Sequence, residues 1–181
     1  MSVVPPLFSD AETDHPAIAQ WCSIILAGDT ARLLLMGPHW SGKSHAAYAG
    51  LRRLLAAGYG EENITVHQAH DLRSSYEPGA IENTTAVTVI DDLTVAVDVV
   101  REAKVPLRPD SADVQAMMAL EAGALADAVA RLSLLPRRSW LLIASSIDRL
   151  AETVGQETAD RLVAVAEQAE LEPRPRPTLR W

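Results

Sequence analysis

One short stretch of the sequence has the residue types and the spacing of a phosphate-binding loop. Gly37 is followed five residues later by Gly42, Lys43 and Ser44, which gives the order G-x-x-x-x-G-K-S. In such a loop backbone N–H groups point at phosphate oxygens, and the positive N-terminal end of the next helix adds to the attraction. Lys43 would reach the terminal phosphates, and the Ser44 hydroxyl would ligate Mg²⁺. The sequence therefore predicts nucleotide binding.

The middle of this loop carries large residues where small ones are usual. Because the cradle is made of backbone, these positions can vary, whereas a side chain at either glycine would obstruct it. We expect Trp40 to be an exposed or neighbour-facing ring, and His39 and His45 to be polar neighbours of the phosphate rather than catalysts. The expected nucleotide-binding residues are Gly37, Pro38, His39, Trp40, Ser41, Gly42, Lys43, Ser44 and His45.

Two consecutive aspartates end the apolar stretch VTVIDD. A bound Mg²⁺ needs an oxygen ligand beyond Ser44 and phosphate, and Asp91 would supply it through water. Asp92 points differently and could orient or deprotonate an attacking water. The alternative is that both aspartates form a turn or cap a helix. Their occurrence together with the loop favours a magnesium site with Ser44 and Asp91 as ligands.

A pair of serines ends another apolar stretch, RSWLLIASS. Ligands of parallel sheets bind at the carboxyl ends of strands. Ser145 or Ser146 could therefore contact the γ-phosphate or the attacking water. The alternative is an ordinary serine in a turn.

Strands and helices alternate along the chain and place these residues. Apolar and β-branched runs predict strands, and apolar residues at helical spacing, bounded by proline or glycine, predict helices. The alternation indicates one α/β domain with a parallel sheet covered on both faces. The predicted strands are 31–37, 64–66, 84–93, 138–146 and 178–181, and the predicted helices are 15–28, 43–57, 111–135 and 157–169.

Composition limits the class of protein. The chain has 181 residues, of which 48% are hydrophobic and 22% charged, as in a globular domain. Its formal net charge is −8, so tight non-specific binding to nucleic acid is not expected. A single cysteine, Cys22, suits a reducing compartment. No secretory signal and no apolar run of roughly 18 residues is found, so we expect a cytoplasmic protein without membrane association.

Four stretches together resemble AAA+ ATPases, and more narrowly the helicase-loader group of DnaC-like loaders and IstB-like transposition ATPases. They are LLLMGPHWSGKSHAAYAGLRRL, VTVIDDL, WLLIASSIDRL and GQETADRL. The resemblance runs from about residue 16 to the C-terminus. It implies a P-loop NTPase three-layer sandwich with a mostly parallel five-stranded sheet. We expect a flexible N-terminal arm over 1–15, a single AAA+-type domain over 16–181, and no separate lid domain.

The resemblance also implies roles for single residues. Arg161 matches the arginine finger, which reaches the γ-phosphate of a neighbouring subunit. Arg180 matches the second sensor arginine, and Ser145 or Ser146 matches the first sensor. The loop reads Pro-His-Trp-Ser where the family usually has Pro-x-Gly-Thr. For Arg161, the alternative is a surface ion pair with Glu157, four residues earlier on the same helix.

The implied activity is ATP hydrolysis with Mg²⁺, in which the nucleotide state switches the grip on a partner. A replicative helicase or another replication or transposition protein is the expected partner, with single-stranded DNA as a second ligand and a homo-oligomer as the active form. Two alternatives remain open: a nucleotide-dependent adaptor without hydrolysis, and a small-molecule or nucleoside kinase.

Overall fold

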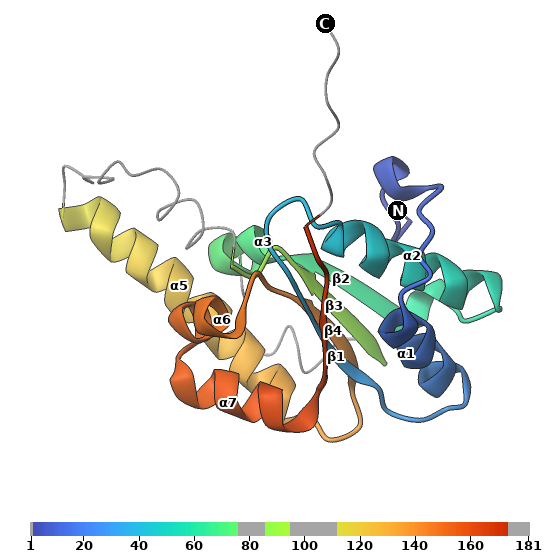
Figure 1. Cartoon of the computed structure of the whole chain (residues 1–181). Coiled ribbons are helices and arrows are strands. Elements are labelled where there is room, and N and C mark those ends of the chain that lie inside the picture. The colour runs from blue at the N-terminus through green and yellow to red at the C-terminus, as the bar shows by residue number, and fades with distance from the viewer. Residues whose placement is uncertain (1, 76–85, 95–111, 174–181) are drawn as a thin grey trace, which may run out of the picture.

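The computed structural model describes residues 2–75, 86–94 and 112–173 (Figure 1). The strands are β1 (Arg32–Met36), β2 (Ile64–Gln68), β3 (Val87–Asp91), β4 (Ser139–Ile143) and β5 (Glu167–Glu170). The helices are α1 (Pro16–Leu26), α2 (Lys43–Ala56), α3 (Ala69–Ser75), α5 (Ala112–Leu134), α6 (Ile147–Val154) and α7 (Gln156–Val165), with short 3₁₀ turns η1 (Pro6–Phe8) and η2 (Glu61–Asn63).

The five strands form one sheet in the order β2-β3-β4-β1-β5. All four neighbouring pairs are parallel, as the alternation of strands and helices predicts. The carboxyl ends of parallel strands lie at the same edge of a sheet. The glycine loop after β1, the aspartates at the end of β3 and the serines after β4 are therefore brought to one edge.

Helices cover both faces of the sheet and make a three-layer sandwich. Helices α1 and α2 lie on one face, and α5, α6 and α7 lie on the other (Figure 1). Successive residues of β1 divide between the two cores, with Leu33 and Leu35 packed beneath α1 and α2 and Leu34 packed beneath the opposite helices. This two-sided burial explains why the strands read as continuous apolar runs rather than as alternating patterns.

The last described strand lies where the sequence predicted the end of a helix, and the prediction of a helix to residue 169 is wrong. Helix α7 ends at Val165, and the backbone of Ala166 is extended, with φ −108° and ψ 147°. The next residues pair with β1, where Leu35 lies opposite Ala169. Backbone hydrogen bonds to β1 thus outweigh the helix propensity of this Ala- and Glu-rich segment. The strand predicted at 178–181 lies outside the described residues.

The chain before α1 packs along α2. The ring of Phe8 stacks on that of Tyr48, with centroids 4.4 Å apart, and lies edge-on to His45. The carbonyl oxygen of Ala11 accepts a hydrogen bond from Arg52 on α2. Within the part of the chain that the structure describes, no helix has the length and apolar character needed to cross a bilayer.

Candidate nucleotide-binding site

The turn between β1 and α2 has a backbone that requires glycine. Gly37 has φ 145° and Gly42 has φ 91°, in the left-handed region that side chains disfavour. A Cβ atom at Gly37 would lie 2.4 Å from the carbonyl oxygen of Leu171 and 2.9 Å from Ser41 Oγ. Gly42 begins α2 without a side-chain cap, so the first N–H groups of the helix are not capped by that residue. This is the backbone arrangement that a phosphate cradle needs.

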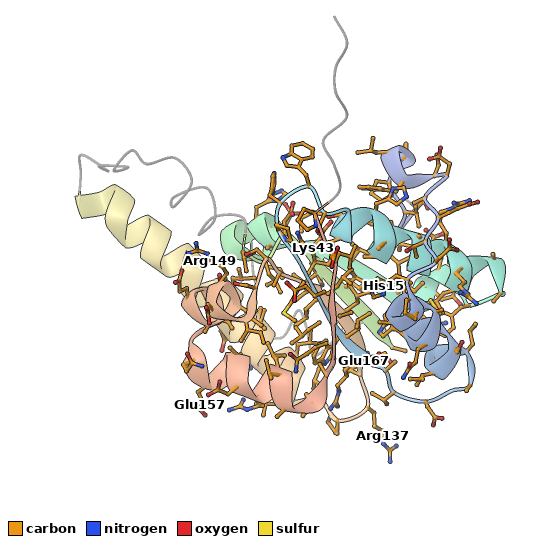
Figure 2. The ribbon with its side chains drawn as sticks, in the orientation of Figure 1. His15, Lys43, Arg137, Arg149, Glu157 and Glu167 are labelled. Atoms are coloured by element: carbon orange, nitrogen blue, oxygen red, sulfur yellow. The ribbon has the colours of Figure 1, made fainter. Side chains whose placement is uncertain are left out.

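Lys43 places a cation within this turn (Figure 2). Its Nζ atom donates hydrogen bonds of 2.7 Å to the carbonyl oxygens of Gly37 and Pro38. Nearby, Ser41 is only 1% exposed, and its Oγ atom finds no hydrogen-bond partner among the residues that the structure describes. A lysine ammonium group and a buried hydroxyl that lacks a hydrogen-bond partner among the described residues can both bind a phosphate oxygen. The residues present therefore fit a bound phosphate.

Trp40 has the backbone conformation that glycine would adopt most easily. Its φ is 66°, and its side chain is 74% exposed, with the ring edge-on to His39. A left-handed conformation costs a residue with a side chain about 1–2 kcal/mol. The structure thus explains why a glycine is usual at this point of the loop, and why tryptophan here strains it.

Ser44 and Asp91 meet at the edge of the sheet. Ser44 Oγ donates a hydrogen bond of 2.9 Å to Asp91 Oδ1, which also accepts one from the backbone N–H of Asp92. Burial, and secondly the charge of Asp92, raises the pKa of the Asp91 carboxyl to about 6. Ser44 and Asp91 thus bring two oxygen ligands close together, which suits a hard cation such as Mg²⁺. A nearby positive charge would stabilise the ionised form of the Asp91 carboxylate.

Asp92 differs from its neighbour in exposure and backbone. Asp91 is buried, whereas Asp92 is exposed and has φ 60°. Asp92 lines a small cavity of about 20 Å³ that includes Lys43 and Ser145. A carboxylate in this position can act on a group bound beside Lys43, whereas Asp91 does not line this cavity.

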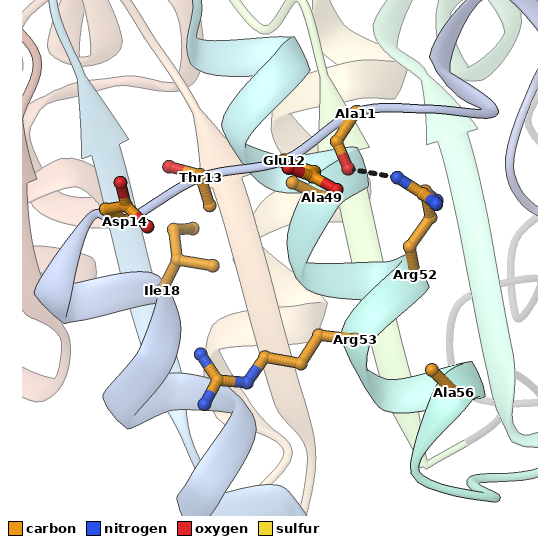
Figure 3. Close-up of a pocket in the computed structure, with 9 residues that line it drawn as sticks. All are labelled: Ala11, Glu12, Thr13, Asp14, Ile18, Ala49, Arg52, Arg53 and Ala56. Atoms are coloured by element: carbon orange, nitrogen blue, oxygen red, sulfur yellow. Dashed lines mark hydrogen bonds between the residues drawn. The ribbon is translucent and has the colours of Figure 1, made fainter.

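A larger open cavity, of about 320 Å³, lies between residues 11–14 and α2 (Figure 3). Its charged lining residues are Arg52, Arg53, Glu12 and Asp14, so positive and negative groups balance. None of the residues predicted to bind nucleotide lines it. The predicted phosphate-binding residues therefore lie outside this larger cavity.

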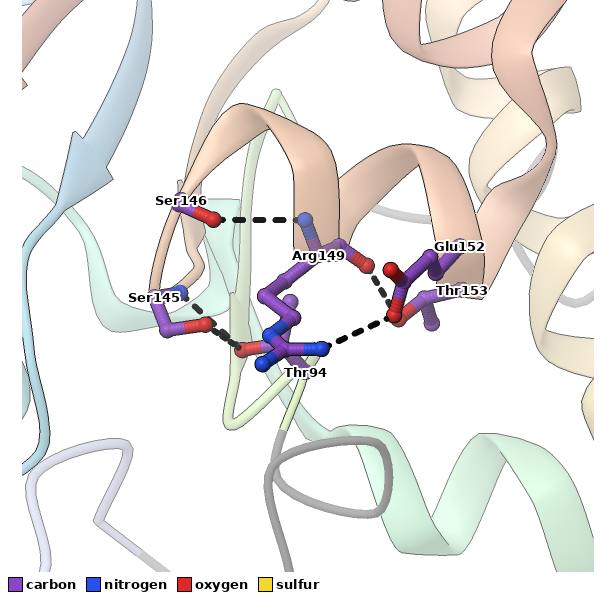
Figure 4. A network of polar contacts seen from close by, with 6 residues as sticks. All are labelled: Thr94, Ser145, Ser146, Arg149, Glu152 and Thr153. Carbon is purple, nitrogen blue, oxygen red and sulfur yellow. Dashed lines mark hydrogen bonds and ion pairs between the residues drawn. The ribbon is translucent and has the colours of Figure 1, made fainter. Parts of the chain in front are cut away.

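The two serines after β4 have different surroundings (Figure 4). Ser146 Oγ accepts a hydrogen bond of 3.2 Å from the backbone N–H of Arg149 and thereby caps α6. Ser145 instead lines the cavity shared with Lys43 and Asp92, and its carbonyl oxygen accepts from the N–H of Gly37 at 3.2 Å. Of the two serines, Ser145 is therefore the one that lines the cavity beside Lys43.

Comparison with solved structures identifies the fold. The chain superimposes on a DNA replication initiation factor with a TM-score of 0.55 at 11% identity, and on the replication initiator DnaA bound to AMPPCP and single-stranded DNA with 0.55 at 12%. It superimposes on the DnaC helicase loader with a TM-score of 0.55 at 13% identity. The chain shares the fold of these replication proteins. No family model and no curated protein matches its sequence.

The extent of the match differs among these AAA+ structures. The aligned region covers 94% of this chain but 51% of each of the two initiator chains. For the DnaC helicase loader, it covers 92% of this chain and 99% of the loader chain. The chain therefore spans about half the length of the initiators and nearly all of the loader chain.

Of the two arginines that the AAA+ resemblance singled out, the described part of the chain contains Arg161, and it does not bring this residue to the loop. Arg161 lies on α7, where its Nη2 atom contacts Glu157 Oε1 at 2.9 Å, with side-chain exposures of 32% and 90%. Figure 2 shows Glu157 at the lower left of the molecule, away from Lys43 near its upper centre. Arg180 lies outside the described residues.

Sequence reasoning missed Thr94. This residue follows the aspartates, is 3% exposed, and forms hydrogen bonds with Ser145. The available signal was a polar residue directly after the motif VTVIDDL, but nothing local distinguishes it from an ordinary turn residue.

Proposed function

We propose that the chain binds ATP with Mg²⁺ at the glycine loop and hydrolyses it, as an AAA+-type ATPase acting in DNA replication. The observation that carries the proposal is the 2.9 Å contact between Ser44 and Asp91 beside Lys43. These groups come from the start of α2 and the end of β3, and their meeting supplies both a phosphate-binding cation and oxygen ligands for a metal.

Each group of the site has a distinct task. The N–H groups at the start of α2 and the ammonium of Lys43 bind the phosphates, while Ser44 and Asp91 hold the metal. Bound Mg²⁺ would neutralise charge that develops on the phosphoryl oxygens. Asp92 orients the attacking water or accepts its proton, and Ser145 donates a hydrogen bond to the γ-phosphate.

The proposal extends to an assembly. Arg161 cannot serve the loop of its own chain while it pairs with Glu157 on α7. As an arginine finger it would act on the site of a neighbouring copy, and Arg180 would contact phosphate as the second sensor. A homo-oligomer is then the active form.

The partner we propose is a replicative helicase or another replication or transposition protein, with the chain as a loader or accessory factor. The DnaC helicase loader shares the fold over nearly its whole chain, which supports this assignment at the level of architecture. The net charge of −8 favours a protein partner over non-specific nucleic acid. Single-stranded DNA, which is bound in the DnaA structure, is the second ligand to test.

One observation favours an adaptor that binds ATP without hydrolysing it. No arginine is among the described residues that line the cavity beside Lys43. The described part of a single chain therefore offers Lys43 at this cavity but no arginine to stabilise the transition state. In that case ATP would order the loop without turnover.

Lys43→Ala tests the proposal against Arg137→Ala as a matched control. Both variants remove one positive charge, but Arg137 is exposed and lies at the opposite end of the molecule from Lys43 (Figure 2). We expect ATP·Mg²⁺ affinity, measured by calorimetry, to fall at least tenfold in Lys43→Ala and to stay unchanged in Arg137→Ala. Equal affinities in both variants would refute the site.

Phosphate release separates the candidate activities. Release of phosphate without an added acceptor identifies an ATPase, whereas a kinase requires the acceptor. Binding without release identifies the adaptor. The assay is run both with the chain alone and at high protein concentration, because the proposed finger acts between copies.

A further inference from the structure

Thr94 links the ends of two neighbouring strands through one hydroxyl group. Thr94 Oγ1 accepts a hydrogen bond of 3.0 Å from the backbone N–H of Ser145 and donates one of 3.0 Å to Ser145 Oγ (Figure 4). The two residues follow β3 and β4, which are paired in the sheet. Thr94 therefore holds both the backbone and the side chain of Ser145.

Ser145 is also joined to the phosphate loop. Its carbonyl oxygen accepts from the N–H of Gly37, while the neighbouring Leu93 N–H donates to the carbonyl oxygen of Ile143. Ser145 thus connects the loop after β1 to the segment that follows the two aspartates. Ser145 and Lys43 line the same small cavity. A displacement of Thr94 would therefore move the Ser145 hydroxyl relative to Lys43.

The direction of these hydrogen bonds matters for the chemistry. A hydroxyl group has one donor hydrogen and two acceptor lone pairs. Because Thr94 donates to Ser145 Oγ, this contact uses an acceptor position of the Ser145 hydroxyl and not its hydrogen. A phosphate oxygen bound beside Lys43 is a strong acceptor for that hydrogen.

We propose that Thr94 is a positioning residue that orients the Ser145 hydroxyl toward the γ-phosphate of bound ATP. This inference rests on the proposed nucleotide site and adds a device by which the site distinguishes ATP from ADP. Because ADP has no γ-phosphate, a defect in Ser145 orientation weakens ATP binding and turnover while leaving ADP binding unchanged. A purely structural link between β3 and β4 would instead alter stability without changing this preference.

Thr94→Val and Thr94→Ser form the test pair. Valine keeps the branched shape and removes both hydrogen bonds, whereas serine keeps the hydroxyl. The affinities for ADP and for a non-hydrolysable ATP analogue are measured by calorimetry with Mg²⁺, and turnover is measured by phosphate release. We expect valine to lower the ATP-to-ADP affinity ratio by about three- to tenfold, the range of one or two hydrogen bonds, and serine to restore it.

A double variant separates positioning from a direct role. If Thr94 acts through Ser145, then Thr94→Val combined with Ser145→Ala should show the same affinity ratio as Ser145→Ala alone. Thermal unfolding checks that each variant is folded, and Thr94→Ala replaces the valine variant if that one is not.

Two failures have different meanings. If the wild-type chain binds ATP through Lys43 and the variant without the Thr94 hydroxyl keeps the wild-type ATP-to-ADP affinity ratio, the role of Thr94 is refuted. The proposed nucleotide site then stands. Additive losses in the double variant also refute the role of Thr94. A wild-type chain that binds neither nucleotide overturns the proposed function and this inference together.

Discussion

Replacing Asp91 by asparagine should stabilise the chain while removing the proposed metal-dependent activity. Asp91 is 4% exposed, and burial together with the charge of Asp92 raises its pKa from 3.8 to about 6. The folded state therefore disfavours the ionised carboxylate relative to the unfolded chain. Asparagine has no charge to bury, and its side-chain oxygen can still accept from Ser44 and from the N–H of Asp92.

The sign and size of the effect follow from proton linkage. For an acid whose pKa is raised on folding, stability is unaffected below the unfolded pKa and is lost as the pH rises through the window from 3.8 to about 6. A shift of about two pKa units corresponds to about 3 kcal/mol above that window, and to about half of this at pH 5. The asparagine NH₂ group would be buried without a hydrogen-bond partner, which costs about 1 kcal/mol and offsets part of this gain in stability. The net gain in the free energy of unfolding is then about 2 kcal/mol at pH 8, and about 0.5 kcal/mol at pH 5.

The assay is urea unfolding without nucleotide or metal at both pH values. Asp29→Asn is the matched control, because Asp29 is exposed and the substitution changes the net charge equally. The control should stay within about 0.5 kcal/mol of wild type at both pH values. An Asp91→Asn variant that is less stable than wild type at pH 8, or whose gain does not shrink at pH 5, would refute the electrostatic reasoning. Magnesium-dependent phosphate release should fall at least tenfold in the same variant if Asp91 holds the metal.

Two further predictions concern the loop and the assembly. Trp40→Gly should raise the free energy of unfolding by about 1 kcal/mol by relieving the left-handed backbone, whereas Trp40→Ala should not, because alanine carries the same strain. Equal effects of the two substitutions in urea unfolding would show that the ring, and not the backbone, decides. Arg161→Ala should bind ATP normally but lose the rise in specific activity with protein concentration, and mixing it with Lys43→Ala protein should restore part of the phosphate release. If Arg161 forms only its surface pair with Glu157, neither the concentration dependence nor the complementation will be observed, and stability will change by a few tenths of a kcal/mol.

Local patterns in the sequence were sufficient for most of the sheet and for the frame of the site. In the motif G-x-x-x-x-G-K-S, Gly37 and Gly42 have backbone conformations that only glycine adopts easily. The geometry of this loop therefore follows from residues that are neighbours in the sequence. Strands β1, β3 and β4 were predictable because they are buried on both faces and therefore apolar throughout. Their parallel order then required Asp91 to end at the same edge as Ser44.

The fifth strand could not be predicted in the same way. Residues Glu167–Glu170 are mostly exposed and rich in Glu, Gln and Ala, which favour a helix in isolation. Their extended form is stabilised by hydrogen bonds to β1, which lies more than 130 positions earlier in the chain. Such long-range pairing leaves no periodic signal in the strand itself.

The division of roles within the site was likewise decided by tertiary structure. Ser145 and Ser146 are adjacent and chemically identical in the sequence, yet Ser146 caps α6 and Ser145 lines the cavity that includes Lys43. Thr94 gains its importance only because the pairing of β3 with β4 places it beside Ser145, 51 positions later. The sequence by itself determined which residues are candidates to bind phosphate and metal, since that capacity belongs to the residue types and their local spacing. Only the fold decided which serine hydroxyl lies at the cavity beside Lys43, because that depends on contacts between segments far apart in the chain.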